Sequence, residues 1–199
     1  SNNTDSVLLT ATLRDPDRPF APSAIAHVDA THPPEIHWAI RSIAIPSKFQ
    51  EGFNCGTDPE SPQCHLYGAH TADLQEDGTI LVSDTSNSRL VWLQPPEDES
   101  ETATVTAMLT SQHPDWGRER YPNMVQSIEI EGTPHLLVTL KGSAGTGTTP
   151  TNEGRIILWN VSDRAAPHRV WSFPEDGHLA AVHSGRMFET PQGPLLIYA

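Results

Sequence analysis

The sequence predicts an all-β fold in which a unit of short antiparallel strands recurs along the chain. Residues 69–93 show the unit most clearly, as three runs of strand-forming residues separated by turns at 75–78 and 84–88. Gly78 can take a positive φ in the first turn, and the polar residues of the second turn can bond their own backbone. No segment keeps a helical period, so long helices are not expected.

Sequence matches indicate that this unit is repeated. Residues 65–82 align with residues 178–197, and residues 126–138 align with 70–82. Repeated β-rich units of roughly 40–50 residues are typical of the blades of a β-propeller, and chance similarity within a β-sandwich is the alternative. In these alignments His70 is matched with both Gln126 and His183.

The predicted propeller covers residues 1–199 as a single region of four-stranded antiparallel blades. The approximate blades are 6–41, 66–109, 121–173 and 178–199, the last of them partial. The first blade is expected to lack its innermost strand and to use strands near 7–13, 23–29 and 36–40. Because closed propellers need at least four blades and about three and a half are present, we expect a missing carboxyl-terminal portion or a second chain to complete the ring.

The two cysteines lie in an insertion at residues 46–64. Cys55 and Cys64 flank a polar segment that contains proline and glycine, in which a free thiol could not pack into a core. A disulfide closing a loop of roughly ten residues would contribute about 2–3 kcal/mol to stability and implies an oxidising compartment. The chain is therefore predicted to be extracytoplasmic, either secreted or periplasmic. The alternative is that the two cysteines bind a metal ion, although the sequence has no second cysteine pair to complete such a site.

The charge balance narrows the choice of partners. The chain has 12 basic and 25 acidic residues, for a net charge of −13. Such a protein repels nucleic-acid phosphates and anionic lipid surfaces, so neither is an expected partner. No apolar run approaches the roughly 20 residues of a membrane-spanning helix.

Candidate functional residues lie where the innermost strand of each blade is expected to begin, at the mouth of the central channel. A histidine there could act as nucleophile or general base, or several could bind a divalent metal such as Zn, Cu or Ca. The alternative is that each histidine bonds the backbone of the next blade and fixes the packing. The candidate catalytic and metal-binding residues are His70 and His183, and the candidate ligand-binding residues are Thr71, Gln126, Ser127 and Ser184.

Two further patterns are interpreted as structural. Asp84 and Asn87 are expected to stabilise their turn through side-chain bonds to the backbone, with Arg89 paired to Asp84 across the hairpin. Tryptophans on the outer strands would fill the space between neighbouring blades. These tryptophans are Trp38, Trp92, Trp159 and Trp171.

The segment from His70 to Arg89 resembles the blades of NHL-type and arylsulfotransferase-like β-propellers. The shared elements are the histidine, Asp77-Gly78, the apolar run at 80–82, and the Asp-x-x-Asn-x-Arg pattern that begins at Asp84. The arylsulfotransferase resemblance implies a channel histidine that acts as nucleophile in sulfuryl transfer from a phenolic sulfate. The matching candidates are His70 and His183, although the Arg and Lys expected around a sulfuryl group are scarce. The peptide-amidating lyases are similar in holding a metal with channel histidines.

Two functions therefore remain open. The first is an interaction or scaffold propeller that presents loops to a protein or glycan partner, with structural histidines. The second is an enzyme that uses a channel-mouth histidine, with or without a metal, on a small-molecule ligand such as a sulfate ester. The first is favoured because few charged residues converge on the predicted site.

Overall fold

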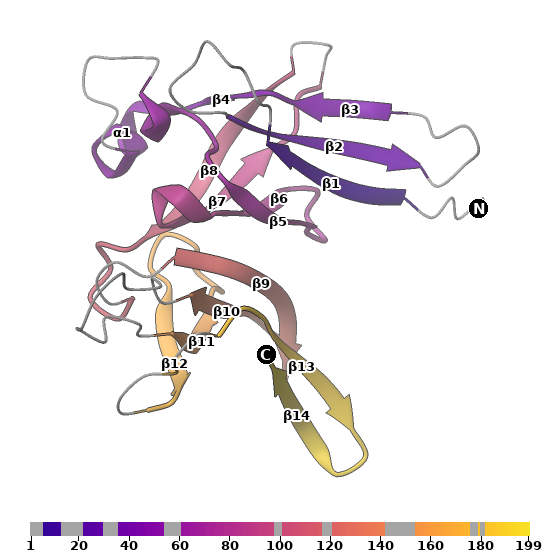
Figure 1. Cartoon of the computed structure of the whole chain (residues 1–199), viewed down its shortest axis with the longest axis vertical. Coiled ribbons are helices and arrows are strands. Elements are labelled where there is room, and N and C mark those ends of the chain that lie inside the picture. The colour runs from indigo at the N-terminus through magenta and orange to yellow at the C-terminus, as the bar shows by residue number, and fades with distance from the viewer. Residues whose placement is uncertain are drawn as a thin grey trace. The chain divides into compact units, whose positions relative to one another are not determined.

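The computed structural model describes residues 6–12, 22–29, 36–53, 61–97, 101–116, 121–141, 154–175, 179 and 182–199. Within these residues the chain forms mainly antiparallel β-sheets and one α-helix, α1 (Ser47–Phe53), as Figure 1 shows. The predicted all-β class is confirmed. The contacts divide the chain into two compact units, Ser1–Asn87 with Val91–Met108, and Ser88–Leu90 with Leu109–Ala199.

The first unit begins with a three-stranded antiparallel sheet in the order β1-β2-β3. Its strands are β1 (Ser6–Thr12), β2 (Ser23–Asp29) and β3 (Ile36–Ile40). All three were expected from their β-branched and aliphatic runs. Ile25 and Ile40 lie opposite each other and are fully buried, so this sheet contributes to the core of the unit.

The second sheet has five strands in the order β4-β8-β7-β6-β5. In chain order they are β4 (Ser42–Ala44), β5 (Ala69–Leu74), β6 (Ile80–Asp84), β7 (Arg89–Gln94) and β8 (Thr102–Thr110). All of β6 is buried, and so is β7 except for its last residue. Strands covered on both faces carry continuous apolar runs, which explains why these two show no polar alternation.

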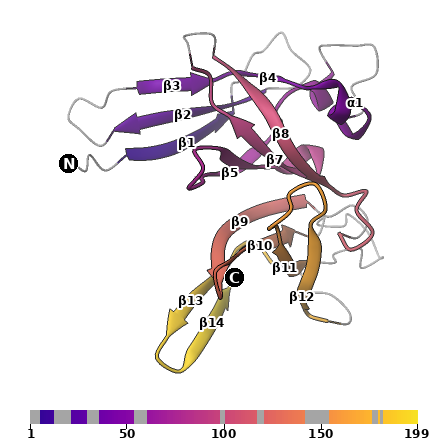
Figure 2. The same cartoon turned by 180° about the vertical axis from the view of Figure 1, so that it is seen from behind.

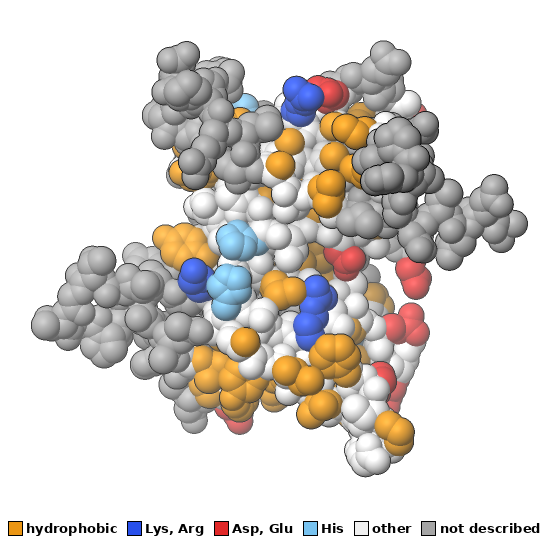
Figure 3. Space-filling view, turned by 45° about the vertical axis from the view of Figure 1, so that its right-hand side comes forward, with side chains coloured by type: hydrophobic (Ala, Val, Ile, Leu, Met, Phe, Trp, Pro, Cys, Tyr) orange, Lys and Arg blue, Asp and Glu red, His pale blue; other side chains and the backbone are white. Residues whose placement is uncertain are grey.

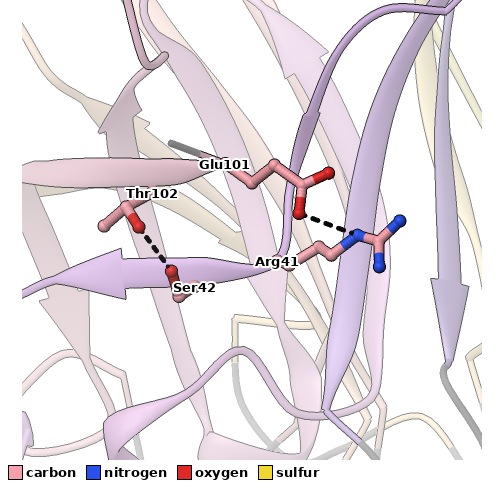
Figure 4. Close-up of polar contacts among 4 residues, drawn as sticks. All are labelled: Arg41, Ser42, Glu101 and Thr102. Carbon is pink, nitrogen blue, oxygen red and sulfur yellow. Dashed lines mark hydrogen bonds and ion pairs between the residues drawn. The ribbon is translucent and has the colours of Figure 1, made fainter. Parts of the chain in front are cut away.

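Strand β4 adds a parallel edge to this sheet, which the sequence did not predict. The backbone amides of Arg41 and Ser42 both donate to the carbonyl of Glu101, at 2.9 and 3.2 Å. Side chains of the same residues add an ion pair and a hydrogen bond, which Figure 4 shows. Arg41 Nε lies 3.1 Å from Glu101 Oε2, and Ser42 Oγ lies 2.7 Å from Thr102 Oγ1. The chain thus passes directly from the β1–β3 sheet to the outer edge of the next.

The second unit contains a four-stranded sheet in the order β12-β11-β10-β9 and a two-stranded hairpin, β13-β14 (Figure 2). Leu137 and Ile156 of the sheet form a core cluster with Leu158 and Val182. Residues of the hairpin pack against this cluster. The strands are β9 (Tyr121–Ile130), β10 (Thr133–Lys141), β11 (Arg155–Asn160), β12 (His168–Phe173), β13 (Gly185–Thr190) and β14 (Gly193–Tyr198).

The first turns of the two larger sheets differ in length. Strands β5 and β6 are joined by residues 75–79, whereas β9 and β10 are joined only by Glu131 and Gly132. Both residues of the shorter turn have positive φ, 52° and 73°, as a type I′ hairpin turn requires. The sequence alignment carried no gap here, and this difference changes which residues are equivalent.

The cysteine prediction falls partly outside the described residues. Cys64 ends a short 3₁₀ helix, η1 (Pro62–Cys64), whereas Cys55 is not among the described residues. The disulfide between them stays a prediction.

Candidate functional site

The start of strand β5 carries a β-bulge. Ala69 pairs with Asp84, and Thr71 pairs with Ser83, which leaves His70 as the extra residue of the ladder. The His70 side chain is exposed. A bulge re-aims the side chains around it, and bulges are over-represented beside active sites.

Strand β9 carries a bulge at the corresponding place. Pro122 pairs with Leu140, and Met124 pairs with Thr139, so that Asn123 is the extra residue. Unlike His70, Asn123 is buried, with 1% of its surface exposed.

The backbone just before strand β13 bulges in the same way. The amides of His183 and Ser184 both donate to the carbonyl of Ala199, at 2.6 and 3.2 Å. Pairing then continues regularly from Gly185 and Tyr198. Two residues opposite one is the definition of a bulge, and here Ser184 follows His183 as Asn123 follows Pro122.

Strand pairing therefore makes His70, Asn123 and Ser184 equivalent. The sequence alignment had matched His70 with Gln126 and His183, and the structure corrects this. The alignment followed the second strands and assumed equal turns, whereas the turn at residues 131–132 is shorter than the turn at 75–79. The resulting offset from Gln126 to Asn123 is three residues, an odd number that exchanges the two faces of the strand.

The hydroxyl of Thr71 is engaged within its own sheet. Thr71 Oγ1 lies 2.8 Å from Ser83 Oγ, and the Thr71 amide donates to the same Ser83 oxygen at 2.8 Å. This pair bridges β5 and β6 immediately after the bulge. The hydroxyl therefore contributes to holding the bulge in place.

Asp84 and Asn87 fix the connector that leads into β5. Asp84 is fully buried; its Oδ1 accepts the Tyr67 amide at 2.6 Å and its Oδ2 accepts Asn87 Nδ2 at 3.0 Å. Asn87 Nδ2 also donates to the carbonyls of His65 and Pro62, at 2.9 and 3.1 Å. These side chains bond backbone groups of the preceding connector, and within the turn they bond each other. Their predicted bonds to the backbone of the turn itself stay a prediction. The predicted pairing of Arg89 with Asp84 stays a prediction.

Gln126 bonds strand β13 with both ends of its amide. Its Nε2 donates to the Met187 carbonyl at 3.0 Å, and its Oε1 accepts the Met187 amide at 2.8 Å. A side-chain amide that makes both bonds to one residue replaces a neighbouring strand at that point. Asn123 adds a bond from its Nδ2 to the His183 carbonyl, at 2.6 Å. Sequence reasoning did not identify Asn123, because only the length of the turn reveals its position.

Close backbone approach accompanies these bonds. A Cβ on Gly185 would lie 2.8 Å from Thr139 Oγ1 and 3.0 Å from Ile156 Cδ1. A side chain at Gly185 would therefore push β13 away from the sheet that Gln126 holds.

The predicted site residues fall into both units. His70 and Thr71 belong to the first unit, whereas Gln126, Ser127, His183 and Ser184 belong to the second. Ser127 and His183 are exposed and Ser184 is half-buried. Within the described ranges, no group of three or more His, Cys, Asp or Glu residues is placed to hold a metal ion. The metal-binding role of His70 and His183 stays a prediction.

Comparison with known proteins gives no relative. No family model, curated protein or solved structure matches the chain. In the part of the chain that the structure describes, no helix has the length and apolar character needed to cross a membrane.

Proposed function

We propose that the chain is part of an extracytoplasmic β-propeller that acts as an interaction or scaffold module. Consecutive up-and-down meanders whose first strands bulge at equivalent positions, His70, Asn123 and Ser184, support the blade reading. The partner would be a protein or a glycan, bound at the bulged ends of the first strands. The predicted disulfide supports the extracytoplasmic location.

One observation favours the scaffold role over catalysis. Two of the candidate polar groups hold the fold together: both ends of the Gln126 amide bond Met187, and the Thr71 hydroxyl bonds Ser83. A binding or catalytic group has to keep a donor or acceptor for its ligand.

The second candidate function is an enzyme with a channel-mouth histidine. The observation that favours it is the exposure of both His70 and His183, each beside a bulge. An exposed imidazole can attack the sulfur of an aryl sulfate, taking the sulfuryl group and releasing a phenolate. A second phenol would then accept the sulfuryl group from the histidine.

Turnover and metal content separate the two functions. The chain is incubated with p-nitrophenyl sulfate and a phenol acceptor, and bound Zn, Cu and Ca are measured, for the native chain and for His70→Ala and His183→Ala. The scaffold proposal expects no turnover above buffer and the same metal content in all three proteins. Turnover that is lost in either variant would support the enzyme instead.

Partner binding is tested by photo-crosslinking. A benzophenone amino acid at position 70 reports on the bulged end of β5, and the same group at position 77 reports on the turn at the other end. We expect a discrete crosslinked partner from extracellular material at position 70 and none at position 77. Equal labelling at both positions, or at neither, contradicts a binding surface at the bulged end.

A further inference from the structure

The turn that follows strand β11 begins with Asn160-Val161-Ser162, in which an asparagine stands two residues before a hydroxyl side chain. Asn-x-Ser with a middle residue other than proline is the acceptor sequence for N-linked glycans. Ser162 is exposed and Asn160 is half-buried, so both side chains reach the surface. The other sequence of this kind, at residues 2–4, lies outside the described residues.

Ser162 bonds the side-chain oxygen of Asn160 twice. Its backbone amide donates to Asn160 Oδ1 at 3.0 Å, and its hydroxyl donates to the same oxygen at 2.7 Å. Because a backbone N–H can only donate, the oxygen of the planar side-chain amide faces Ser162 and Nδ2 faces away from it. Asn160 Nδ2 makes no hydrogen bond to the described residues. The fold therefore leaves free the nitrogen that would carry a glycan.

The same two bonds favour reaction at Asn160 Nδ2. An amide nitrogen is a poor nucleophile, because its electron pair is shared with the carbonyl group. When Nδ2 loses a proton, the negative charge develops largely on Oδ1, where both hydrogen bonds from Ser162 stabilise it. The Ser162 hydroxyl thus has a chemical role in addition to fixing the turn.

We propose that Asn160 is an acceptor for an N-linked glycan, transferred from a lipid-diphosphate-linked oligosaccharide. In the transfer, Asn160 Nδ2 loses a proton and bonds the first sugar carbon. The bond from that carbon to the diphosphate oxygen breaks, and the lipid diphosphate leaves with the electron pair. An N-linked glycan requires the proposed extracytoplasmic location, on which this inference rests.

The turn presents this geometry both early and late in folding. The bonds to Asn160 Oδ1 join residues only two apart, so they can form before the rest of the chain has folded. In the folded chain the Val161 amide donates to the Pro134 carbonyl at 3.1 Å, and Asp163 Oδ1 accepts the Ala165 amide at 2.9 Å. These contacts hold the turn on both sides of Ser162.

The position of Asn160 in the sheet is compatible with the proposed partner surface. Asn160 pairs with His135, close to the β9–β10 turn. At the other end of β11, Arg155 pairs with Leu140, which lies at the bulge. A glycan on Asn160 would therefore lie at the end of this sheet opposite its bulge and leave the bulged end uncovered.

The surface beside the turn is partly apolar. Strand β12, which pairs with β11, carries Val170 and Trp171, which are 51% and 39% exposed. Figure 3 shows that hydrophobic side chains reach the surface in several groups on one side of the molecule. N-linked glycans are bulky and solubilising. A glycan at Asn160 would thus add solubility next to β12.

Expression of the full chain in a eukaryotic secretory host, behind a cleavable signal peptide, tests the proposal. The tryptic peptide of residues 156–164 is analysed by mass spectrometry before and after peptide N-glycosidase, which converts a glycosylated asparagine to aspartate. We expect a glycan on Asn160 that the enzyme removes, and its loss in Asn160→Gln. The N-terminal peptide reports separately on the sequence at residues 2–4.

Two substitutions of Ser162 form a matched pair. Threonine and valine have the same branched shape, and only threonine carries a hydroxyl. Ser162→Thr should keep the glycan, whereas Ser162→Val should lose it. Both replace an exposed side chain, and circular dichroism confirms that both variants fold.

Either of two results overturns the inference: a native chain whose Asn160 carries no glycan, or a glycan that persists in Ser162→Val. Luminal and secreted chains are both analysed, so retention in the host does not prevent the measurement. The signal peptide delivers the chain to the secretory route whatever its natural location is. The outcome therefore leaves the proposed function to its own test by crosslinking at positions 70 and 77.

Discussion

Single buried polar side chains decide where the connectors of this protein run. Asp84 receives a backbone amide from the connector on one oxygen and the Asn87 amide on the other, and Asn87 extends the same contact to two carbonyls of that connector. An Asp-x-x-Asn pattern predicts a turn from sequence, because both residue types favour turns. That the same groups would bind residues 61–67 could not be predicted, because the contact joins distant parts of the chain.

We expect Asp84→Ala to lower the free energy of unfolding by about 3 kcal/mol. The substitution removes the carboxylate that accepts the Tyr67 amide and one of the three acceptors of the Asn87 side chain, and it deletes a fully buried group that holds the connector. Urea denaturation measures the change. Asp163→Ala is the control, since exposed Asp163 also accepts a backbone amide, from Ala165, and should cost less than about 1 kcal/mol. Similar losses in both variants would contradict a special role for Asp84.

Thr139→Val is expected to stabilise the chain by about 1 kcal/mol. Thr139 is fully buried, and its hydroxyl has no hydrogen-bond partner among the residues described. The hydroxyl therefore loses its hydrogen bonds to water on folding, and no bond within the protein compensates for them. Valine keeps the branched shape. Thermal unfolding measures the difference, with Thr106→Val as the control, because the Thr106 hydroxyl donates to the Trp92 carbonyl at 3.2 Å. A loss of stability in Thr139→Val would mean that the hydroxyl is bonded in solution.

At the scale of elements, the positions of the strands could be predicted from the sequence. Which residues of different sheets are equivalent, and which strands pair at the sheet edge, could not. The runs at 80–84 and 89–94 are short, apolar and bounded by turn residues, which predicts strands whatever their neighbours are. The sequence did not reveal the length of the β9–β10 turn, because glutamate rarely adopts the left-handed conformation that Glu131 has here. With that turn assigned, Asn123 rather than Gln126 matches His70. The parallel pairing of β4 with β8 was also missed, since it depends on backbone groups that every residue has.

The β9–β10 turn gives a test at this scale. Glu131→Asn should stabilise the chain by roughly 0.5–1 kcal/mol, because asparagine tolerates the left-handed φ of 52° better than glutamate does. Differential scanning calorimetry provides the measurement.

Gly132→Ala is the reciprocal substitution and should destabilise by roughly 1 kcal/mol, because alanine is strained at a φ of 73°. A Cβ there meets no atom within 4 Å, so the change reports on the backbone alone. If both substitutions prove neutral, the turn does not hold this conformation in solution.

At the scale of the whole molecule, stability depends on how consecutive sheets are joined. The hairpin β13-β14 is held to the β9–β12 sheet by Gln126, Asn123 and the core cluster around Leu137. The sequence predicted that repeated units would stack, but it assigned Gln126 to ligand binding. Whether an amide faces a ligand or a neighbouring strand depends on the packing of separate units, which a repeat pattern does not contain.

We expect Gln126→Ala to speed amide hydrogen exchange in β13 and β14 by roughly tenfold, because losing two backbone bonds costs about 1–2 kcal/mol of local stability. Mass spectrometry of peptides from residues 182–199 gives the measurement. Glu129→Ala, an exposed position on the same strand, is the control. Faster exchange across the whole chain, rather than in the hairpin, would show that Gln126 supports global folding and not this joint.

Strand β7 belongs to both compact units, since Leu90 groups with one and Val91 with the other. The chain then returns to the second unit only after Met108. Apart from residues 88–90, the two units follow one another in sequence and divide between Met108 and Leu109. A single cut in the connector between β8 and β9 would therefore leave the complete β1–β3 and β4–β8 sheets in one fragment and strands β9–β14 in the other. Each group of sheets thus corresponds to one stretch of the gene, which recombination could exchange as a block.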